Sequence, residues 1–172
     1  MKTRQEDGFT LVELLIVVAI IGIVASIGVA QVMRARLAAN ESSAIASMRT
    51  INTAQVSYAN SAAFGGYATS LVILATACPG GTAFISPDLD PSLPSATPVA
   101  TGLLKSGYAV DLIAAGVGAA SDCNGAAAMT DYVATAVPRT MGATGERGFN
   151  TNSGGTIFFD PAGAPTGTTP IQ

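Results

Sequence analysis

Histidine is absent from this chain of 172 residues, and charged residues make up only 11% of it. Histidine is the commonest general base in enzymes and the commonest metal ligand, so its absence argues against catalysis and against a metal cofactor. The net charge of −3 provides no basic surface for nucleic acid. We therefore expect no enzyme, no cofactor and no direct nucleic-acid site.

Hydrophobic residues account for 49% of the chain, which leaves a surface with few charges. Such a surface suits a subunit that is covered by copies of itself, so we expect a homo-oligomer. The length accommodates one membrane helix and one modest globular domain.

Residues 11–32 form a largely apolar run in which Glu13 is the only charged residue. About 22 helical residues can cross a bilayer core of roughly 30 Å. A carboxylate within the bilayer costs roughly 2.5–3.5 kcal/mol and needs a partner. Two interpretations follow: Glu13 meets a positive charge on a neighbouring chain, or it lies at the membrane surface and its side chain reaches water.

The segment GFTLVELLIVVAIIGI, residues 8–23, resembles the class III signal and N-terminal helix of type IV pilins and pseudopilins. This resemblance implies that a prepilin peptidase cuts between Gly8 and Phe9 and that the new amine of Phe9 is N-methylated. It also implies that Glu13 helps to recruit a subunit into a growing filament. Cleavage would place the α-ammonium one helical turn before Glu13, where the same group of a neighbouring chain could pair with it.

The resemblance divides the first part of the chain into a leader, residues 1–8, and a transmembrane or filament-core helix, residues 9–32. It places the leader in the cytoplasm and the helix in the inner membrane before assembly. Pilins commonly have a helix-bending proline where this chain has Ala30, although Gly22 and Gly28 could loosen the helix locally.

Residues 33–64 are expected to continue the helix, because no glycine or proline occurs between Val29 and Phe64. One face is apolar and should pack on a sheet. This face comprises Leu37, Ala44, Ile45, Met48, Ile51 and Tyr58, and the polar interruptions are Arg34, Glu41, Ser47, Arg49 and Asn52. A coiled-coil stalk is the alternative, but heptads are not sustained.

Gly65 and Gly66 end the helix, and residues 65–107 are expected to form a proline-punctuated connection. Asp88 and Asp90 could hold a calcium ion, but no EF-hand spacing supports this, so a solvated loop is the simpler interpretation.

Three segments have the composition of strands: residues 108–113, 131–137 and 156–160. A fourth, residues 148–151, can pair with the last through a turn at residues 152–155. Residues 108–172 therefore predict a small antiparallel meander, packed on the long helix as an α+β head; this is also the pilin fold that the resemblance implies. Residues 161–172 are expected to be a loosely held surface segment.

Cys78 and Cys123 are the only cysteines, and both lie in the part expected to be exported. In an oxidising periplasm they should form a disulfide. By closing the loop between them, it should stabilise the fold by roughly 4 kcal/mol. The alternative, a metal or redox pair, lacks CxxC spacing and histidine partners.

Other motifs are weak. Residues 142–148 are glycine-rich but lack the Gly-Lys-Ser/Thr ending of a phosphate loop, so we interpret them as a turn. Lys105 and Ser106 are the only adjacent Ser-Lys pair available for nucleophilic catalysis. Arg147 could pair with Glu146 or with an acid of a neighbouring subunit, although a solvated arginine is commoner.

The sequence thus favours a structural subunit of a type IV pilus-like filament, with prepilin peptidase and a pilus or secretion assembly machinery as partners. A major pseudopilin of a type II secretion system is the alternative within the same fold. A monomeric, membrane-anchored periplasmic binding protein is the alternative from another class. After assembly the subunit would lie in a cell-surface pilus or a periplasmic pseudopilus.

Overall fold

A computed structural model describes residues 8–93, 98–99 and 102–171. The chain divides into two compact units, Met1–Arg36 and Leu37–Gln172. Residues 1–7 of the expected leader lie outside the described residues.

Helix α1 (Leu11–Ser61) is the longest element of the chain. It starts directly after Thr10 and ends four residues before Gly65, whose φ of +95° suits glycine. Its bounds lie close to those expected from the sequence, because the segment is rich in alanine and has no proline.

The second unit contains an antiparallel sheet with the strand order β2-β3-β4-β5-β6-β7-β8, and β1 pairs with β5 beside this path. The strands are β1 (Tyr67–Ala68), β2 (Pro98–Val99), β3 (Gly102–Lys105), β4 (Tyr108–Gly118), β5 (Ala128–Pro138), β6 (Gly148–Asn152), β7 (Ile157–Asp160) and β8 (Thr169–Pro170). Each strand from β2 to β8 pairs with the next along the chain, so the sheet is a meander. The predicted α+β fold, a long helix on an antiparallel sheet, is confirmed and is consistent with the pilin fold.

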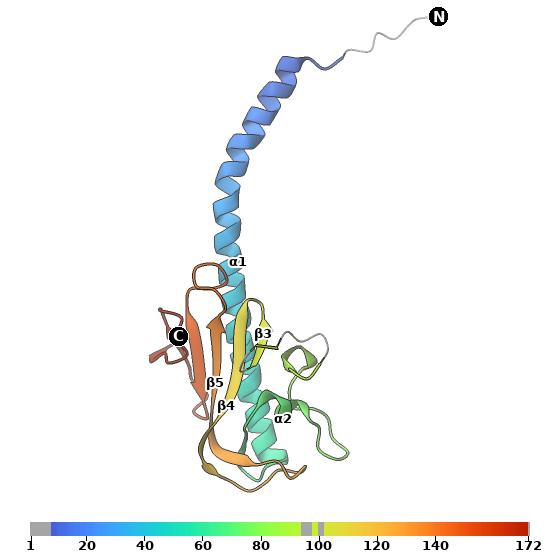
Figure 1. Ribbon diagram of the computed structural model, residues 1–172, viewed down its shortest axis with the longest axis vertical. Coiled ribbons are helices and arrows are strands. Elements are labelled where there is room, and N and C mark those ends of the chain that lie inside the picture. Colours follow the sequence, from blue (N-terminus) through green and yellow to red (C-terminus); the bar gives the residue numbers. More distant parts are fainter. Residues whose placement is uncertain (1–7, 94–97, 100–101, 172) are drawn as a thin grey trace, which may run out of the picture. The chain divides into compact units, whose positions relative to one another are not determined.

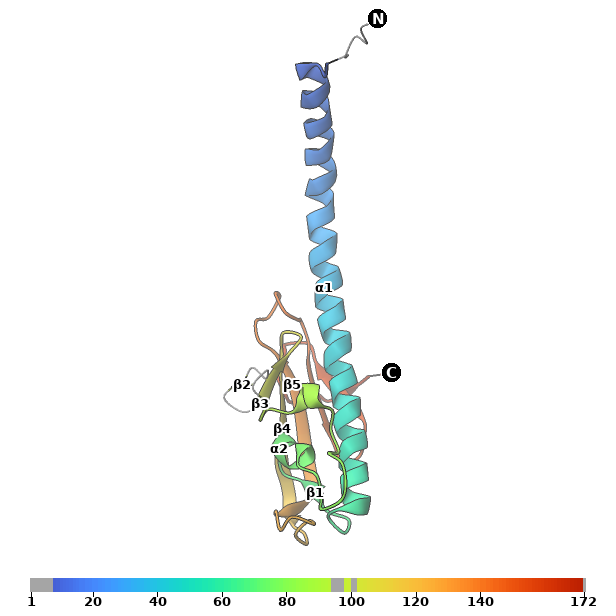
Figure 2. The same ribbon diagram turned by 90° about the vertical axis from the view of Figure 1, so that its right-hand side faces the viewer.

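Within the second unit, residues 37–61 of α1 run alongside the strands in both views (Figures 1 and 2). Strands β4 and β5 turn alternate side chains inward, as the period of two requires. The inward residues of these two strands are Tyr108, Val110, Leu112, Tyr132, Ala134 and Ala136, all of which are buried. The apolar face expected on the helix supplies the other wall of the core.

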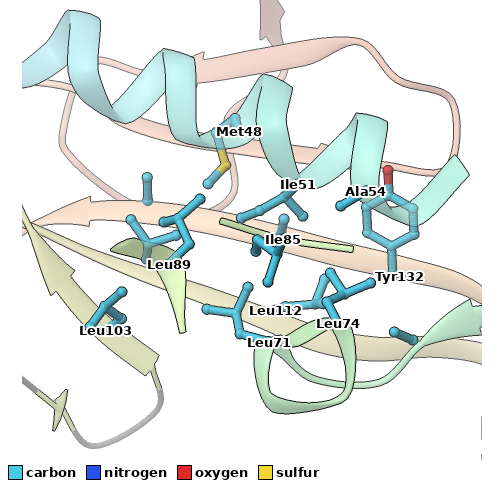
Figure 3. Close-up of a cluster of buried hydrophobic side chains, with 14 of the residues drawn as sticks. Met48, Ile51, Ala54, Leu71, Leu74, Ile85, Leu89, Leu103, Leu112 and Tyr132 are labelled. Carbon is cyan, nitrogen blue, oxygen red and sulfur yellow. The ribbon is translucent and has the colours of Figure 1, made fainter. Parts of the chain in front are cut away.

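Figure 3 shows how this core is filled: Met48 and Ile51 of α1 point toward Leu112 of the sheet. Two short elements add further apolar side chains, α2 (Leu71–Ala75) and the 3-10 turn η1 (Pro87–Leu89). Leu74 and Leu89 are fully buried in the same cluster. The connection between helix and sheet therefore forms part of the core.

The inner face of α1 also carries buried polar side chains that bond to the head. The amide of Gln55 donates to the carbonyl of Ala68 at 2.9 Å and accepts from the Ala68 N–H at 2.8 Å. Asn52 donates to Thr151 and accepts from the hydroxyl of Tyr132. Asn52 is half-buried, whereas Gln55, Thr151 and Tyr132 are buried, so the loss of these bonds would leave a buried group unpaired.

Glu41 is the charged member of this inner face, and only 8% of it is exposed. Its carboxylate accepts the backbone N–H groups of Glu146 and Arg147 at 3.0 and 3.3 Å. The guanidinium of Arg147 donates to Glu41 through Nε at 2.9 Å and Nη2 at 2.6 Å. The expectation of a solvated Arg147 was therefore wrong, because the fold brings it to an acid 106 residues away along the sequence.

The far end of α1 is tied to the loop between β4 and β5. The hydroxyl of Tyr58 donates to Asp122 at 2.9 Å, and Asp122 also accepts backbone N–H groups of its own loop. Next to Asp122, Cys123 is disulfide-bonded to Cys78, with a Cα–Cα distance of 5.6 Å. The predicted disulfide is present in the structure.

Residues 65–107 were expected to form an irregular connection, but they contain five short regular elements, namely β1, α2, η1, β2 and β3. Strand β3 joins β4 through a turn in which Ser106 and Gly107 both have positive φ. Four-residue strands show too little alternation to be recognised from sequence. The tail is likewise attached, because β8 pairs with β7.

The disulfide gives a direct prediction: native protein should show no reactive thiol until reductant is added. Thiol labelling followed by mass measurement checks this. Two reactive thiols in unreduced native protein would contradict the pairing of Cys78 with Cys123.

We also predict a loss of stability in alkali. Burial, followed by the neighbouring charges of Tyr67 and Asp131, raises the pKa of Tyr132 from 10.0 to about 12. Burial also raises the pKa of Tyr58 and of Tyr108. A raised folded-state pKa stabilises the fold fully below pH 10, and this contribution is lost as the pH rises from 10 toward 12.

Tyrosinate absorbance and circular dichroism, recorded together on the full chain in detergent, check this expectation. Most of the tyrosine ionisation should coincide with unfolding above pH 10. Complete ionisation near pH 10 with the fold intact would contradict it.

Candidate functional site

The candidate site is the start of the described chain, where Gly8, Phe9 and Thr10 precede α1. No atom lies within 4 Å of the position that a Cβ on Gly8 would occupy. Phe9 is 82% exposed. The backbone at the expected cleavage position is therefore open, and a membrane peptidase could reach it without unfolding the chain.

Thr10 and Glu13 form a reciprocal cap at the start of α1. The N–H of Glu13 donates to Oγ1 of Thr10 at 3.2 Å, and the N–H of Thr10 donates to Oε2 of Glu13 at 2.9 Å. The Thr10 hydroxyl also donates to Oε2, at 2.7 Å. This arrangement is a capping box, which satisfies two backbone donors that a helix start leaves open.

This role of Thr10 was missed from the sequence, although its signal was present. A threonine followed three residues later by a glutamate, just before an apolar run, is the sequence pattern of a capping box. Thr10 donates two hydrogen bonds to Glu13, one from its backbone N–H and one from its hydroxyl. Both are accepted by Oε2, so Oε1 of Glu13 is not used by them. The carboxylate is thus held in one orientation while one oxygen is available to a donor from another molecule.

The helix that follows exposes nearly all of its apolar side chains. Large hydrophobic residues between Leu11 and Met33 are 46–78% exposed. Among the described residues, α1 is long and apolar enough to cross a membrane, and none of its most apolar window is buried. The apolar first half of α1 is therefore not part of a globular core, and it suggests membrane anchoring.

A shallow apolar groove marks this exposed part of α1 within the first unit. It has a volume of about 440 Å³, and its lining residues are Ala25, Gly28, Val29, Val32, Met33 and Arg36. No atom lies within 4 Å of a Cβ built on Gly28, so the helix backbone is uncovered there. Such small-residue positions allow close approach of another helix.

The structure gives other partners to the two acids considered for calcium. Asp88 is paired with Lys105 and bonded to Ser86, and these contacts lower the pKa of Asp88. Asp90 accepts the N–H and the hydroxyl of Ser92 at 2.9 and 2.6 Å. In the part of the chain that the structure describes, no cluster of three or more acidic or cysteine ligands could hold a metal ion.

The side chains and backbone of the remaining motifs form hydrogen bonds within the fold. Lys105 bonds to Asp88, whereas the hydroxyl of Ser106 accepts from Ser43 at 2.9 Å. The glycine-rich residues 142–148 turn back on themselves, since the N–H of Gly142 donates to the carbonyl of Gly145 at 2.9 Å. The predicted turn is observed there.

Comparison with protein families gives a match at the same end of the chain. The model described as the prokaryotic N-terminal methylation motif matches residues 3–29. Residues 3–29 carry a class III signal. This is the signal of type IV pilins and pseudopilins.

The matched segment covers 27 of the 172 residues. The match therefore describes the N-terminal segment and gives no information on the head. No curated protein and no solved structure matches the chain. The matched motif is one of structural proteins and is not enzymatic. Phe9, Thr10 and Glu13 all lie within it.

Proposed function

We propose that this chain is the structural subunit of a type IV pilus-like helical filament. The observation that carries the proposal is the class III signal, followed directly by an apolar helix whose surface nothing else in the described chain covers. Lipid can cover that surface before assembly, and the helices of other copies can cover it afterwards. The chain would thus leave the inner membrane as it enters the filament.

Processing is the first step of the proposed function. A prepilin peptidase hydrolyses the peptide bond between Gly8 and Phe9, and the new amine of Phe9 is then methylated. The open surroundings of Gly8 and the exposure of Phe9 support this step, because both must enter an enzyme's active site. The apolar helix stays with the processed chain.

Assembly is the second step. The carboxylate of Glu13 accepts an ionic hydrogen bond from the Phe9 ammonium of a neighbouring copy, while apolar helices pack around the pair. The capping box supports this role, because Thr10 orients the carboxylate and the positive helix start stabilises its charge. Helix packing would supply most of the free energy, and the ion pair would set the stagger of the helices.

The pseudopilin alternative rests on the same observation, because pseudopilins share the class III signal. In that case the filament would be a short periplasmic pseudopilus of a type II secretion system. The third candidate, a monomeric anchored binding protein, is less well supported. It leaves unexplained why Glu13 sits within an apolar helix and why the chain carries the methylation motif.

We predict that the N-terminal peptide from a sheared cell-surface fraction begins at Phe9 and carries one methyl group on its amine. Mass spectrometry of that peptide, with electron microscopy of the same fraction, checks this. Methylated Phe9 in long fibres supports a pilus, whereas methylated Phe9 confined to the cell envelope supports a pseudopilus. A chain that keeps Met1 would contradict the processing site.

A second prediction separates the charge of Glu13 from its capping role. Glu13→Gln keeps an acceptor for the Thr10 N–H but removes the charge, so the chain should insert and be cleaved yet assemble poorly. Thr10→Ala removes both bonds of the hydroxyl and keeps the charge, so it should cost only about 1 kcal/mol of helix stability and leave most assembly intact.

Filament yield by microscopy, and cleavage by mass spectrometry, are the measurements for both variants. Cleavage of each variant must first match that of the wild type, since Thr10 lies within the processing motif. Equal loss of filaments in the two variants would show that helix capping, rather than the charge, accounts for the role of Glu13.

A further inference from the structure

From Phe9 onward, the first unit carries charged side chains only near its two ends. Residues 9–33 contain one charged residue, Glu13, and Arg34 and Arg36 follow at the end of the unit. At a rise of 1.5 Å per residue, Glu13 and Arg36 lie about 35 Å apart along the helix. The helix is thus acidic at its start, basic at its end and uncharged in between.

The two arginines lie on different sides of the helix. Arg36 lines the apolar groove of about 440 Å³, together with Gly28 and Val32. Arg34 precedes Arg36 by two residues, which is about 200° around a helix, so it lies away from the groove. Both arginines are exposed, and the two ion pairs found in the described part of the chain involve other residues. The groove therefore has an exposed cation at its C-terminal end.

The carboxylate of Glu13 can accept more hydrogen bonds than Thr10 supplies. An ionised carboxylate has about four acceptor positions. Thr10 uses two of them, both on Oε2. In the proposed filament the Phe9 ammonium of one neighbour uses a position on Oε1, and a further position remains there. A guanidinium suits that position, because it keeps its charge and is more weakly hydrated than an ammonium.

The spacing of Glu13 and Arg36 fits both stages of the proposed function. A bilayer core of roughly 30 Å is shorter than their separation, so both charges can reach water before assembly. Among packed helices each charge would instead face apolar side chains, where an unpaired charge is costly. Parallel copies staggered by about 35 Å place Glu13 of one copy level with Arg36 of another, and each then supplies the other's partner.

The same stagger brings an aromatic side chain to the groove. Phe9 precedes Glu13 by four residues, and Val32 precedes Arg36 by four, so Phe9 of one copy lies level with Val32 of the other. The side chain of Phe9 is 82% exposed, and no atom lies within 4 Å of a Cβ built on Gly28. A ring seated there would remove apolar surface of both copies from contact with water or lipid.

We propose that the N-terminal end of a second copy occupies this groove, with its Glu13 paired to Arg36 and its Phe9 ring lying against Gly28 and Val32. The two halves of the contact lie at different ends of the helix, so the contact is head-to-tail. Contacts of this type propagate as an open helix and do not close into a dimer. The inference rests on the proposed filament function and gives Glu13 a second partner, on a different neighbour from the Phe9 ammonium.

Two matched substitutions test the ion pair. Arg36→Gln removes the cation of the groove, so filament yield should fall about tenfold or more, as expected when one partner of a buried charge pair is lost. Arg34→Gln makes the same change in charge on the other side of the helix, and its yield should stay within about twofold of the wild type. Electron microscopy of sheared filaments measures both yields. Both variants should be cleaved and methylated normally, because residues 34 and 36 lie outside the methylation motif.

Photo-crosslinking in intact filaments identifies the segment that lies in the groove. The full chain carries the photoreactive analogue p-benzoylphenylalanine in place of Val32, and it is co-expressed with the wild-type chain so that filaments form. After irradiation we expect the analogue to be attached to residues 9–13 of a second copy. Ile27 is 67% exposed and lies on the side of the helix away from the groove, so the analogue in its place should attach elsewhere.

The outcomes separate this contact from the proposed function. Equal filament yields from Arg36→Gln and Arg34→Gln, or attachment of the analogue at residue 32 to lipid or to another segment, would overturn the contact and leave the filament function in place. A wild-type chain that is anchored but never forms filaments would overturn both.

Discussion

The uncovered apolar surface of the first half of α1 is the constraint on which the rest of this protein depends. From Leu11 to Met33 the helix presents its large side chains outward, and no part of the described chain packs over them. Water cannot accommodate so much apolar surface, so a membrane or other helices must cover it. The head has a core of its own, which leaves the exposed helix available for anchoring and for association with other copies.

Glu13 is the one charge that this surface carries, and its local chemistry reconciles two demands. As part of the capping box it satisfies the backbone at the helix start within a single chain. The same bonds orient its carboxylate toward the end at which the proposed cleavage would create an amine. The Glu13 carboxylate is thus hydrogen-bonded within the isolated subunit and can still accept a bond from a second molecule, since the cap does not use Oε1.

In the head, helix and sheet are joined by specific polar bonds as well as by the apolar core. Glu41, Asn52, Gln55 and Tyr58 lie along the inner face of α1, and each bonds to a different part of the head. Apolar packing alone tolerates small shifts along a helix, whereas a buried hydrogen bond does not, because a shift would leave its partners unpaired. These bonds therefore define the position of α1 on the sheet.

Local signals in the sequence determined the long helix, its apolar half, the methylation motif and the strand pairs around the turn after Asn152. Periodicity, composition and turn chemistry act over a few residues and can be read without a fold. The burial of Glu41, its pairing with Arg147 and the inclusion of β3 in the sheet were decided only by tertiary structure. Glu41 interrupts the apolar pattern and would be assigned to solvent, because the residues that satisfy it lie more than a hundred positions away and meet it only when the head has folded.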